Sequence, residues 1–298
     1  MDRSPALLFR GSATALITPF SDGKIDFDSF ANLIETNIRG GADALVVAGT
    51  TGEASTLSPE EQAALCECAV QVTGGRVPVI GGAGSSDTVH ACHLARLISR
   101  TGCDGLLCVT PYYNKATPRG MELHFSAIAE ASEKPIILYN VPSRTGCSLP
   151  LDVCKSLATH PNVCGIKEAS GDVGFAARVM AACGNDLPLY SGCDNLTLPL
   201  LSMGALGVIS VVGNIIPAVM HAICHAYFVG RPDQAARAHL GALALMDASM
   251  AQVNPVPIKT MCAMMGLCRE EFRLPLCPMM PQEKHKLADL LREYGLTS

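Results

Sequence analysis

The chain has 298 residues, of which 49% are hydrophobic and only 16% are charged, so a large buried core is expected and a disordered chain is excluded. This length fits one large α/β domain or two ordinary ones. The net charge of −5 argues against a nucleic-acid-binding surface, which needs a basic patch.

The cysteines and the amino terminus bear on the cellular compartment. The fourteen cysteines include no Cys-X-X-Cys pair and no zinc-ribbon spacing. Residues 1–10 lack the apolar segment of a secretory signal. We therefore expect a cytoplasmic protein with free thiols.

Eight short apolar segments are predicted to be strands, because each ends in small or polar residues and is followed by an amphipathic stretch. They are residues 13–18, 44–48, 77–81, 105–110, 135–140, 163–168, 187–191 and 207–212. The intervening stretches are predicted helices. Ser58-Pro59-Glu60-Glu61 is a capping box with proline at the first helical position, and another helix is expected from Asp87 to Gly102.

Alternation of apolar strands with helices predicts a parallel sheet that is buried on both faces. Eight such units in about 230 residues favour a (β/α)8 TIM barrel. A doubly wound sheet is the rival fold, but no Gly-X-Gly-X-X-Gly motif opens the first helix. We expect a catalytic barrel over residues 1–231 and a C-terminal helical appendage over 232–298, with helices at 234–250, 256–265 and 282–294.

One long uncharged stretch could be mistaken for a membrane span. No Asp, Glu, Lys or Arg occurs between Asp194 and Arg231. Prolines and glycines divide the stretch into short pieces, so we interpret it as a helix–strand–helix passage through a core rather than as a membrane segment.

Reactive side chains are concentrated at the predicted strand ends, where a barrel assembles its active site. Residues 49–53, Gly-Thr-Thr-Gly-Glu, can form a tight turn whose amides and hydroxyls bind a carboxylate. Tyr139 ends the fifth strand and could transfer protons, and Arg144 follows on a loop held by Pro142 and Gly146. Taken singly, a solvated tyrosine, a solvated arginine and an ordinary turn are the simpler interpretations.

Lys167 is the most informative residue. It interrupts the apolar sixth strand, where the period of two places Val163, Gly165 and Lys167 on one face. Desolvation at such a position favours the neutral amine, which can attack a ketone to form a Schiff base. The alternative is a lysine at a strand end with its ammonium in water.

Two other patterns do not support a site. His221 and His225 have the i, i+4 spacing of a zinc motif, but no third ligand is evident and no metal is expected. Residues 81–85 are glycine-rich, yet they lack the Lys-Ser/Thr pair that a phosphate loop requires.

Four motifs carry a family resemblance: residues 49–53, 111–114 (Pro-Tyr-Tyr-Asn), 139–146 (Tyr-Asn-Val-Pro-Ser-Arg-Thr-Gly) and 165–169 (Gly-Ile-Lys-Glu-Ala). Together they resemble the 4-hydroxy-tetrahydrodipicolinate (dihydrodipicolinate) synthase family. This family belongs to the pyruvate-dependent class I aldolases, which also include sialic acid lyase. The resemblance extends from Gly11 to about Leu296.

The resemblance implies a reaction and its residues. Lys167 would form a Schiff base with pyruvate, and the resulting enamine would attack L-aspartate 4-semialdehyde, without a metal or organic cofactor. Tyr113 would act in the site of a neighbouring subunit, so a homo-oligomer is implied, usually a dimer of dimers. The implied roles are Lys167 as nucleophile; Tyr139, Thr50 and Tyr113 as proton relay; Thr51 for the pyruvate carboxylate; Arg144 for the aldehyde substrate; and Gly192 and Ile209 as neighbours of the lysine.

The chain departs from the family pattern in two places. Around the pocket where some members bind inhibitory lysine it carries Pro59, Gln62, Ser86 and His90, with Tyr112 retained. Because no acidic partner stands at His90, weak or absent inhibition by lysine is expected. Cys193 replaces a second aspartate found in many members.

Three functions remain open from sequence. The first is the synthase, an enzyme of diaminopimelate and lysine biosynthesis. The second is an aldolase acting on a 2-keto-3-deoxy sugar acid or sialic acid, against which Arg144 argues because it suits a short anionic aldehyde. The third is a non-catalytic barrel, which would be expected to lose Lys167 or Tyr139.

Overall fold

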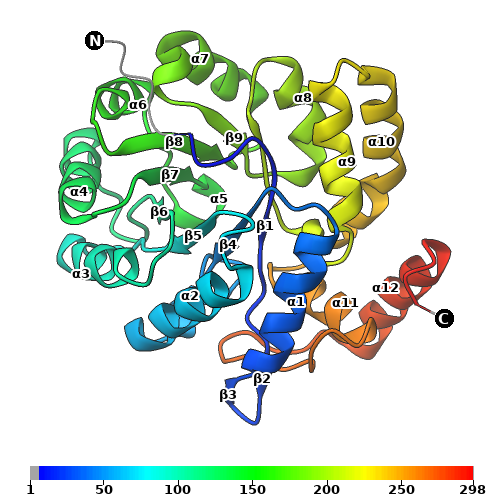
Figure 1. The fold of residues 1–298 in the computed structure, drawn as a ribbon. Helices are drawn as coiled ribbons and strands as arrows, with labels where there is room; N and C mark the ends of the chain where they lie inside the picture. Colours follow the sequence, from blue (N-terminus) through cyan, green and yellow to red (C-terminus); the bar gives the residue numbers. More distant parts are fainter. Residues whose placement is uncertain (1–6, 298) are drawn as a thin grey trace.

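The computed structural model describes residues 7–297, so residues 1–6, which belong to the amino-terminal segment considered above, lie outside the described part. Eight parallel strands form a closed barrel, in which β1 pairs with both β4 and β10 (Figure 1). The strands are β1 (Gly11–Ala15), β4 (Ala44–Val47), β5 (Val79–Gly82), β6 (Gly105–Val109), β7 (Ile136–Asn140), β8 (Val163–Glu168), β9 (Leu189–Ser191) and β10 (Gly207–Ser210). The TIM-barrel prediction is confirmed, and all eight predicted strands are present.

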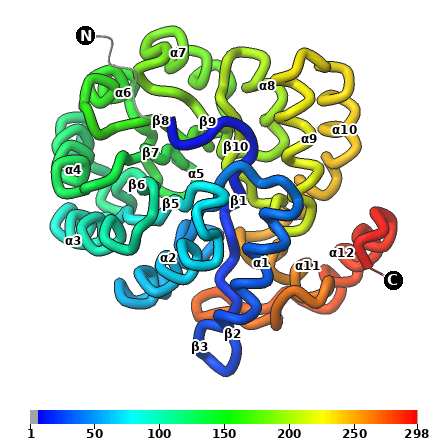
Figure 2. Tube along the Cα trace, viewed as in Figure 1, coloured from blue at the N-terminus to red at the C-terminus, as the bar shows by residue number. Residues whose placement is uncertain are grey.

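Helices surround the barrel, as the trace in Figure 2 shows. They are α1 (Phe27–Arg39), α2 (Pro59–Thr73), α3 (Thr88–Ser99), α4 (Pro118–Ala131), α5 (Pro142–Thr145), α6 (Leu151–Ala158), α7 (Val173–Cys183), α8 (Thr197–Ser202) and α9 (Pro217–Phe228). Short 3-10 turns lie at η1 (Ala54–Thr56), η2 (Gly184–Asp186), η3 (Asp194–Leu196) and η4 (Val212–Asn214). The uncharged stretch after Asp194 is the predicted helix–strand–helix passage, formed by α8, β10 and α9.

Local sequence signals explain how these helices begin. Ser58 Oγ accepts from the Glu61 amide, and the Glu61 carboxylate accepts from the Ser58 amide, so the predicted capping box is formed. Asp87 accepts from the amide of His90 and caps α3. The α3 helix ends at Ser99, three residues before the predicted Gly102, because Arg100 already occupies the C-cap.

A β-bulge in β8 corrects the predicted strand face. Ile136 pairs with Val163 but Ile137 pairs with Gly165, so Cys164 is an extra residue in the ladder. Val163 therefore packs outside the barrel and Cys164 packs inside it. Strict alternation placed Val163 on the face of Lys167, and this was wrong because a bulge shifts the phase by one residue.

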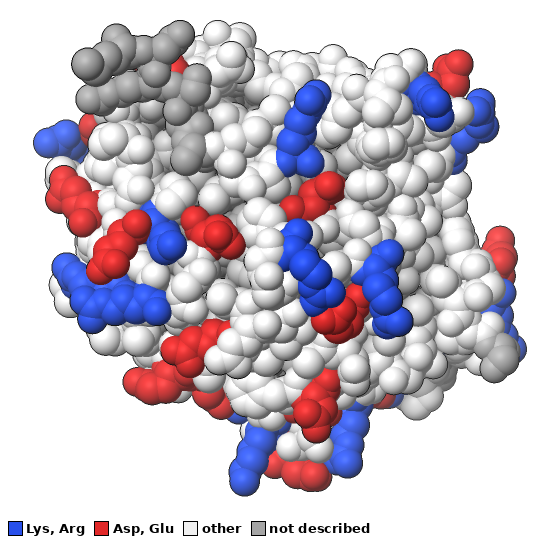
Figure 3. Space-filling view, in the orientation of Figure 1, with Lys and Arg blue, Asp and Glu red and all other residues white. Residues whose placement is uncertain are grey.

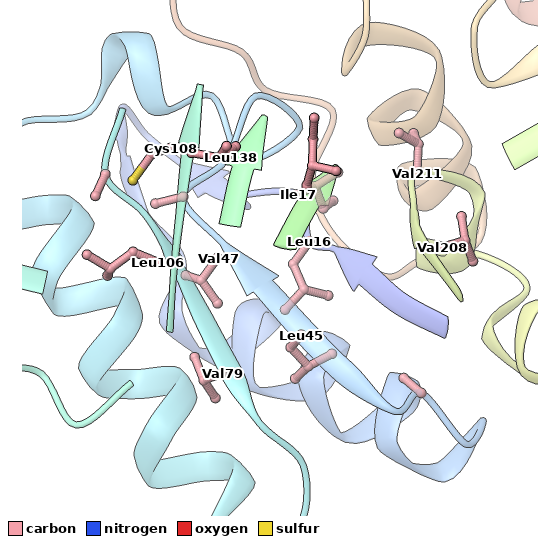
Figure 4. Packing of buried hydrophobic residues seen from close by; sticks show 14 of the residues in the cluster. Leu16, Ile17, Leu45, Val47, Val79, Leu106, Cys108, Leu138, Val208 and Val211 are labelled. Atoms are coloured by element: carbon pink, nitrogen blue, oxygen red, sulfur yellow. The ribbon is translucent and has the colours of Figure 1, made fainter. Parts of the chain in front are cut away.

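The core has two layers. The barrel interior is filled by a smaller cluster that includes Tyr139, Tyr190 and Ile209. A larger cluster lies between the barrel and the helices, and Figure 4 labels some of its members, Leu16, Ile17, Leu45, Val47, Val79, Leu106, Cys108, Leu138, Val208 and Val211. Burial on both faces explains why the strands have nearly continuous apolar sequences.

A hairpin that the sequence patterns did not indicate follows β1. Strands β2 (Phe20–Ser21) and β3 (Lys24–Ile25) pair antiparallel and lie at the bottom of Figure 1. Each has two residues, which is too short for a periodic pattern. The Glu271 carboxylate accepts from the amides of Asp22 and Gly23, so this hairpin lies against the C-terminal part of the chain.

Three further helices follow the barrel. They are α10 (Pro232–Ala248), α11 (Val256–Met264) and α12 (Pro281–Glu293), each within two residues of its prediction. Helix α10 packs along α9, α11 lies beside α1 with most of its residues buried, and α12 extends away from the ring of helices (Figure 1). The division into domains at residue 231 stays a prediction.

The charges on the surface bear on nucleic-acid binding, and the lengths of the helices bear on membrane insertion. Acidic and basic side chains are interspersed on the face in Figure 3, with much uncharged surface between them. Within residues 7–297, none of the helices has the length and apolar character needed to cross a bilayer.

Candidate active site

Lys167 lies on β8 at the inner side of the barrel, and its side chain is only 4% exposed. Its Nζ is 4.4 Å from the centroid of the Tyr139 ring on the neighbouring strand β7. Among the described residues, no carboxylate oxygen lies within 4.0 Å of this nitrogen. The amine is therefore buried without being committed to an ion pair.

Gly192 lies next to this lysine, and Ile209 belongs to the cluster that fills the barrel interior. A Cβ atom at Gly192 would be 3.1 Å from Lys167 Cε and 2.5 Å from Ala169 Cβ, so a side chain there would displace the lysine or its neighbour. Ile209 on β10 is fully buried in the interior cluster that also contains Tyr139. The absence of a side chain at Gly192 therefore leaves room for the side chain of Lys167.

One cavity of about 340 Å³ opens beside Tyr139. Thr50, Tyr139 and Arg144, predicted from three separate motifs, all line it. Its wall also includes Gly49, Ser85, His90, Leu107, Tyr112 and Val141. Tyr139 connects the cavity to Lys167, because its ring contacts the amine and its side chain lines the wall.

The turn over residues 49–53 is held by its own backbone and by the barrel. The amides of Glu53 and Ala54 donate to the carbonyls of Thr50 and Gly49, at 3.1 and 3.2 Å. Thr18 Oγ1 donates to the Gly52 carbonyl at 2.7 Å. Glu53 has a φ of 57°, a left-handed conformation that a non-glycine residue seldom adopts. The surrounding contacts must therefore stabilise this turn.

Thr51 is buried, and its hydroxyl accepts from Asn254 Nδ2 at 2.9 Å. Because the oxygen accepts in this contact, the hydroxyl hydrogen stays available for another acceptor, such as a carboxylate. The sequence motif identified Thr51 but missed Asn254, which lies 203 residues further along the chain.

Arg144 lies on the single-turn helix α5 rather than on the irregular loop that was predicted. Pro142 begins this turn and Gly146, with a φ of 72°, ends it. The Arg144 Nη2 donates to the Asn254 carbonyl at 3.1 Å. Asn254 thus contacts both carboxylate-binding candidates, Thr51 and Arg144.

Tyr113 is separated from the other predicted catalytic residues. Its side chain is 91% exposed, and it does not line the cavity, whereas Tyr112 does. Its φ of 75° is left-handed, so the backbone holds the ring outward at a conformational cost. This arrangement suits a side chain that acts outside its own protomer.

Acidic residues around the lysine are held by hydrogen bonds. Burial raises the pKa of Glu168, although Asn140 Nδ2 donates to it at 2.7 Å. Burial likewise raises the pKa of Asp194, whose Oδ2 accepts from the amides of Val211 and Val212. Asp194 thus links the loop after β9 to the end of β10.

Cys193 stands directly between Gly192 and Asp194. Burial raises the pKa of its thiol to about 11, so the thiol is neutral near pH 7. Where an aspartate would add a negative charge beside the lysine, this chain has an uncharged group.

A second buried lysine was missed by sequence reasoning. Lys259 on α11 is fully buried, and its Nζ lies 2.6 Å from Glu53 Oε1. Its signal was a single lysine in the apolar run Val-Pro-Ile-Lys-Thr-Met, comparable to the signal of Lys167. Nothing in the local pattern identifies its partner, which lies 206 residues away.

The remaining candidates have structural explanations. His221 Nδ1 is 3.2 Å from Asp43 Oδ2, and within residues 7–297 no group of three or more His, Cys, Asp or Glu side chains is placed to hold a metal ion. A Cβ at Gly82 would be 2.0 Å from the Ala48 carbonyl oxygen, and one at Gly84 would be 2.5 Å from the Val109 nitrogen. These glycines allow close backbone approach.

Comparison with known proteins gives a consistent family. The model of the dihydrodipicolinate synthetase family matches residues 8–294. A 4-hydroxy-tetrahydrodipicolinate synthase from Trichlorobacter lovleyi is 45% identical over 97% of this chain and 100% of its own length, and one from Geobacter metallireducens is 43% identical over the same shares.

Solved structures agree with these relatives. The crystal structure of dihydrodipicolinate synthase from Aquifex aeolicus has a TM-score of 0.95 and 40% identity, and the match covers 97% of this chain and 99% of that one. A dihydrodipicolinate synthase from Cyanidioschyzon merolae, solved with lysine bound, has a TM-score of 0.93 and 36% identity over the same shares.

Proposed function

The chain belongs to the dihydrodipicolinate synthetase family, and from this premise we propose that it condenses pyruvate with L-aspartate 4-semialdehyde to give 4-hydroxy-tetrahydrodipicolinate. This is the first committed step of diaminopimelate and lysine biosynthesis. The observation that carries the proposal is the buried, unpaired amine of Lys167 against Tyr139 at the wall of the cavity. The relatives do not favour a sugar-acid or sialic acid aldolase.

Lys167 is the nucleophile. Its amine adds to the C2 ketone of pyruvate, and water leaves to give an imine. Loss of a proton from C3 converts the imine to an enamine, in which the nitrogen serves as the electron reservoir. The enamine carbon attacks the aldehyde carbon of the second substrate, and the aldehyde oxygen takes up a proton. The substrate amino group then attacks the imine carbon, which closes the ring and frees the lysine.

Tyr139, Thr50 and Tyr113 move the protons that these steps require. Tyr139 and Thr50 line the same cavity, and Tyr139 contacts Lys167. Tyr113 is exposed on its own protomer, so it completes the relay in the site of a neighbouring subunit. The working enzyme is therefore at least a dimer, and we propose a dimer of dimers.

Two groups bind the two carboxylates. Thr51 and the amides of the 49–53 turn bind the carboxylate of pyruvate, because the Thr51 hydroxyl keeps its hydrogen for a further acceptor. Arg144 binds the carboxylate of the aldehyde substrate, because its guanidinium is anchored at the cavity wall. Gly192 and Ile209 keep the space around the lysine open.

We also propose that the enzyme works in the cytoplasm. In the described part of the chain, all fourteen cysteines are free thiols, and eight of them are buried in the core as small apolar residues.

The test is a direct assay of the two substrates. The purified protein is incubated with pyruvate and L-aspartate 4-semialdehyde, and the product is identified by mass spectrometry. Formation of the six-membered ring product supports the proposal. Turnover of 2-keto-3-deoxy sugar acids or sialic acid, without turnover of the semialdehyde, would instead support the alternative aldolase.

A further inference from the structure

The buried ion pair between Glu53 and Lys259 joins the catalytic turn to the C-terminal part of the chain. Glu53 is the last residue of the 49–53 turn, whereas Lys259 lies on α11, beyond the barrel. Both side chains have zero exposure, and the Nζ–Oε1 distance is 2.6 Å. No step of the proposed reaction uses either residue.

The lysine is enclosed on several sides. Its Nζ lies 4.1 Å from the centroid of the Phe20 ring and 5.1 Å from that of Phe272. Burial lowers the pKa of Lys259, and the adjacent Glu53 carboxylate opposes this effect. The other carboxylate oxygen of Glu53 accepts from the Arg273 amide at 3.4 Å. Water therefore does not reach the two charged groups, and neither can replace its ion-pair partner by a water molecule.

The pair reaches the proposed pyruvate-binding groups through short backbone connections. The Glu53 amide donates to the Thr50 carbonyl, so the residue whose carboxylate Lys259 holds is also hydrogen-bonded through its backbone to Thr50. Asn254, which lies just before α11, donates through its side chain to the Thr51 hydroxyl. The same C-terminal segment thus contacts the turn at two adjacent points.

We propose that Glu53 and Lys259 form a positioning pair, which fixes the left-handed conformation at Glu53 and thereby holds Thr51 and the turn amides in place for the pyruvate carboxylate. This inference rests on the proposed function, because that function assigns Thr51 and the turn amides to the pyruvate carboxylate. An ion pair is suited to this task, because moving either residue away would leave the other charge buried without a partner. The C-terminal segment is then part of the pyruvate site, although it supplies no catalytic residue.

The test uses the full-length variants Glu53→Gln, Lys259→Met and the double variant, with Leu287→Ala as the control. Leu287 is buried on α12, so its truncation destabilises the C-terminal part without contacting the turn. Thermal stability, both KM values and the borohydride-trapped pyruvate adduct are measured for each variant below its melting temperature.

The positioning role predicts a specific pattern. Each single variant raises the KM for pyruvate about tenfold, while the KM for the semialdehyde changes less than about twofold. The double variant regains thermal stability, because no lone charge remains buried, but keeps the raised KM for pyruvate. All variants still trap pyruvate on Lys167 at saturating concentration.

Two results overturn the inference. In the first, the single variants match the Leu287→Ala control in both KM values at a comparable loss of stability. In the second, the KM for pyruvate returns to the wild-type value together with stability in the double variant. Failure of the wild-type protein to trap pyruvate is a different outcome, since it contradicts the proposed function itself.

Discussion

The two buried lysines of this protein show how surroundings separate a reactive side chain from a structural one. Lys167 is 4% exposed and Lys259 is fully buried, and both amines lie about 4 Å from an aromatic ring, at 4.4 Å from Tyr139 and 4.1 Å from Phe20. Lys259 has a carboxylate at 2.6 Å, whereas Lys167 has none within ion-pair distance among the described residues. Burial alone therefore does not identify a nucleophile, and the absence of a counter-ion does.

The strongest test of this contrast removes the reactive amine. Lys167→Ala should lower kcat by at least about 10⁴-fold, because among the described residues no other lysine amine lies over the Tyr139 ring. Thermal stability should change little, since no carboxylate loses its partner. Steady-state kinetics and a melting curve on the same preparation check both parts, and a large fall in melting temperature would show that Lys167 also supports the fold.

The variant Tyr139→Phe tests whether Lys167, unlike Lys259, depends on the hydroxyl of its aromatic neighbour. The ring stays beside Lys167 but the hydroxyl is lost, so kcat should fall about 10²- to 10³-fold through loss of proton transfer. Lys259 needs no such hydroxyl, and its neighbour Phe20 has none. Single-turnover kinetics should show slow imine formation with unchanged adduct mass. Wild-type rates in this variant would remove Tyr139 from the relay.

The structural lysine should show the opposite behaviour. Lys259→Met leaves the Glu53 charge buried and unpaired, so the free energy of unfolding should fall by about 3–5 kcal/mol. Denaturant unfolding monitored by circular dichroism measures this loss. Lys155→Met, which removes an exposed helical ion pair, is the matched control and should cost less than about 1 kcal/mol.

The smallest expected effect concerns regulation by lysine. Gln62, His90 and Tyr112 line the cavity, and none of its lining residues is an aspartate or glutamate. An effector ammonium therefore lacks a counter-ion, and weak or absent inhibition is expected. Initial rates with increasing lysine measure this. Sub-millimolar inhibition would contradict it and would mean that a neighbouring subunit supplies the missing charge.

Much of the fold could be predicted from the sequence, because strand periodicity and helix caps depend on residues that are close together in the chain. The strand from 163 to 168 was located without error in its bounds, and the capping box at Ser58 formed as expected. The bulge at Cys164 was missed, because an extra residue in a ladder depends on the neighbouring strand rather than on the strand itself. The β2–β3 hairpin is too short to produce a pattern.

The site was predictable only in part for a related physical reason. Lys167 and Tyr139 lie near the carboxyl ends of β8 and β7, and Arg144 follows β7, so barrel geometry brings them to one end. Asn254 and Lys259 approach the 49–53 turn from more than 200 residues away, and no periodicity encodes such a contact. These contacts form only because the C-terminal segment folds back on the turn in the three-dimensional structure.

The most direct test of the central claim is to trap the imine in the wild-type protein. The protein is incubated with pyruvate, reduced with borohydride, digested and mapped by mass spectrometry. We expect one reduced pyruvyl group per chain, on the peptide containing Lys167, with Lys259 unmodified. No adduct on a folded protein, or an adduct on Lys259, would contradict it.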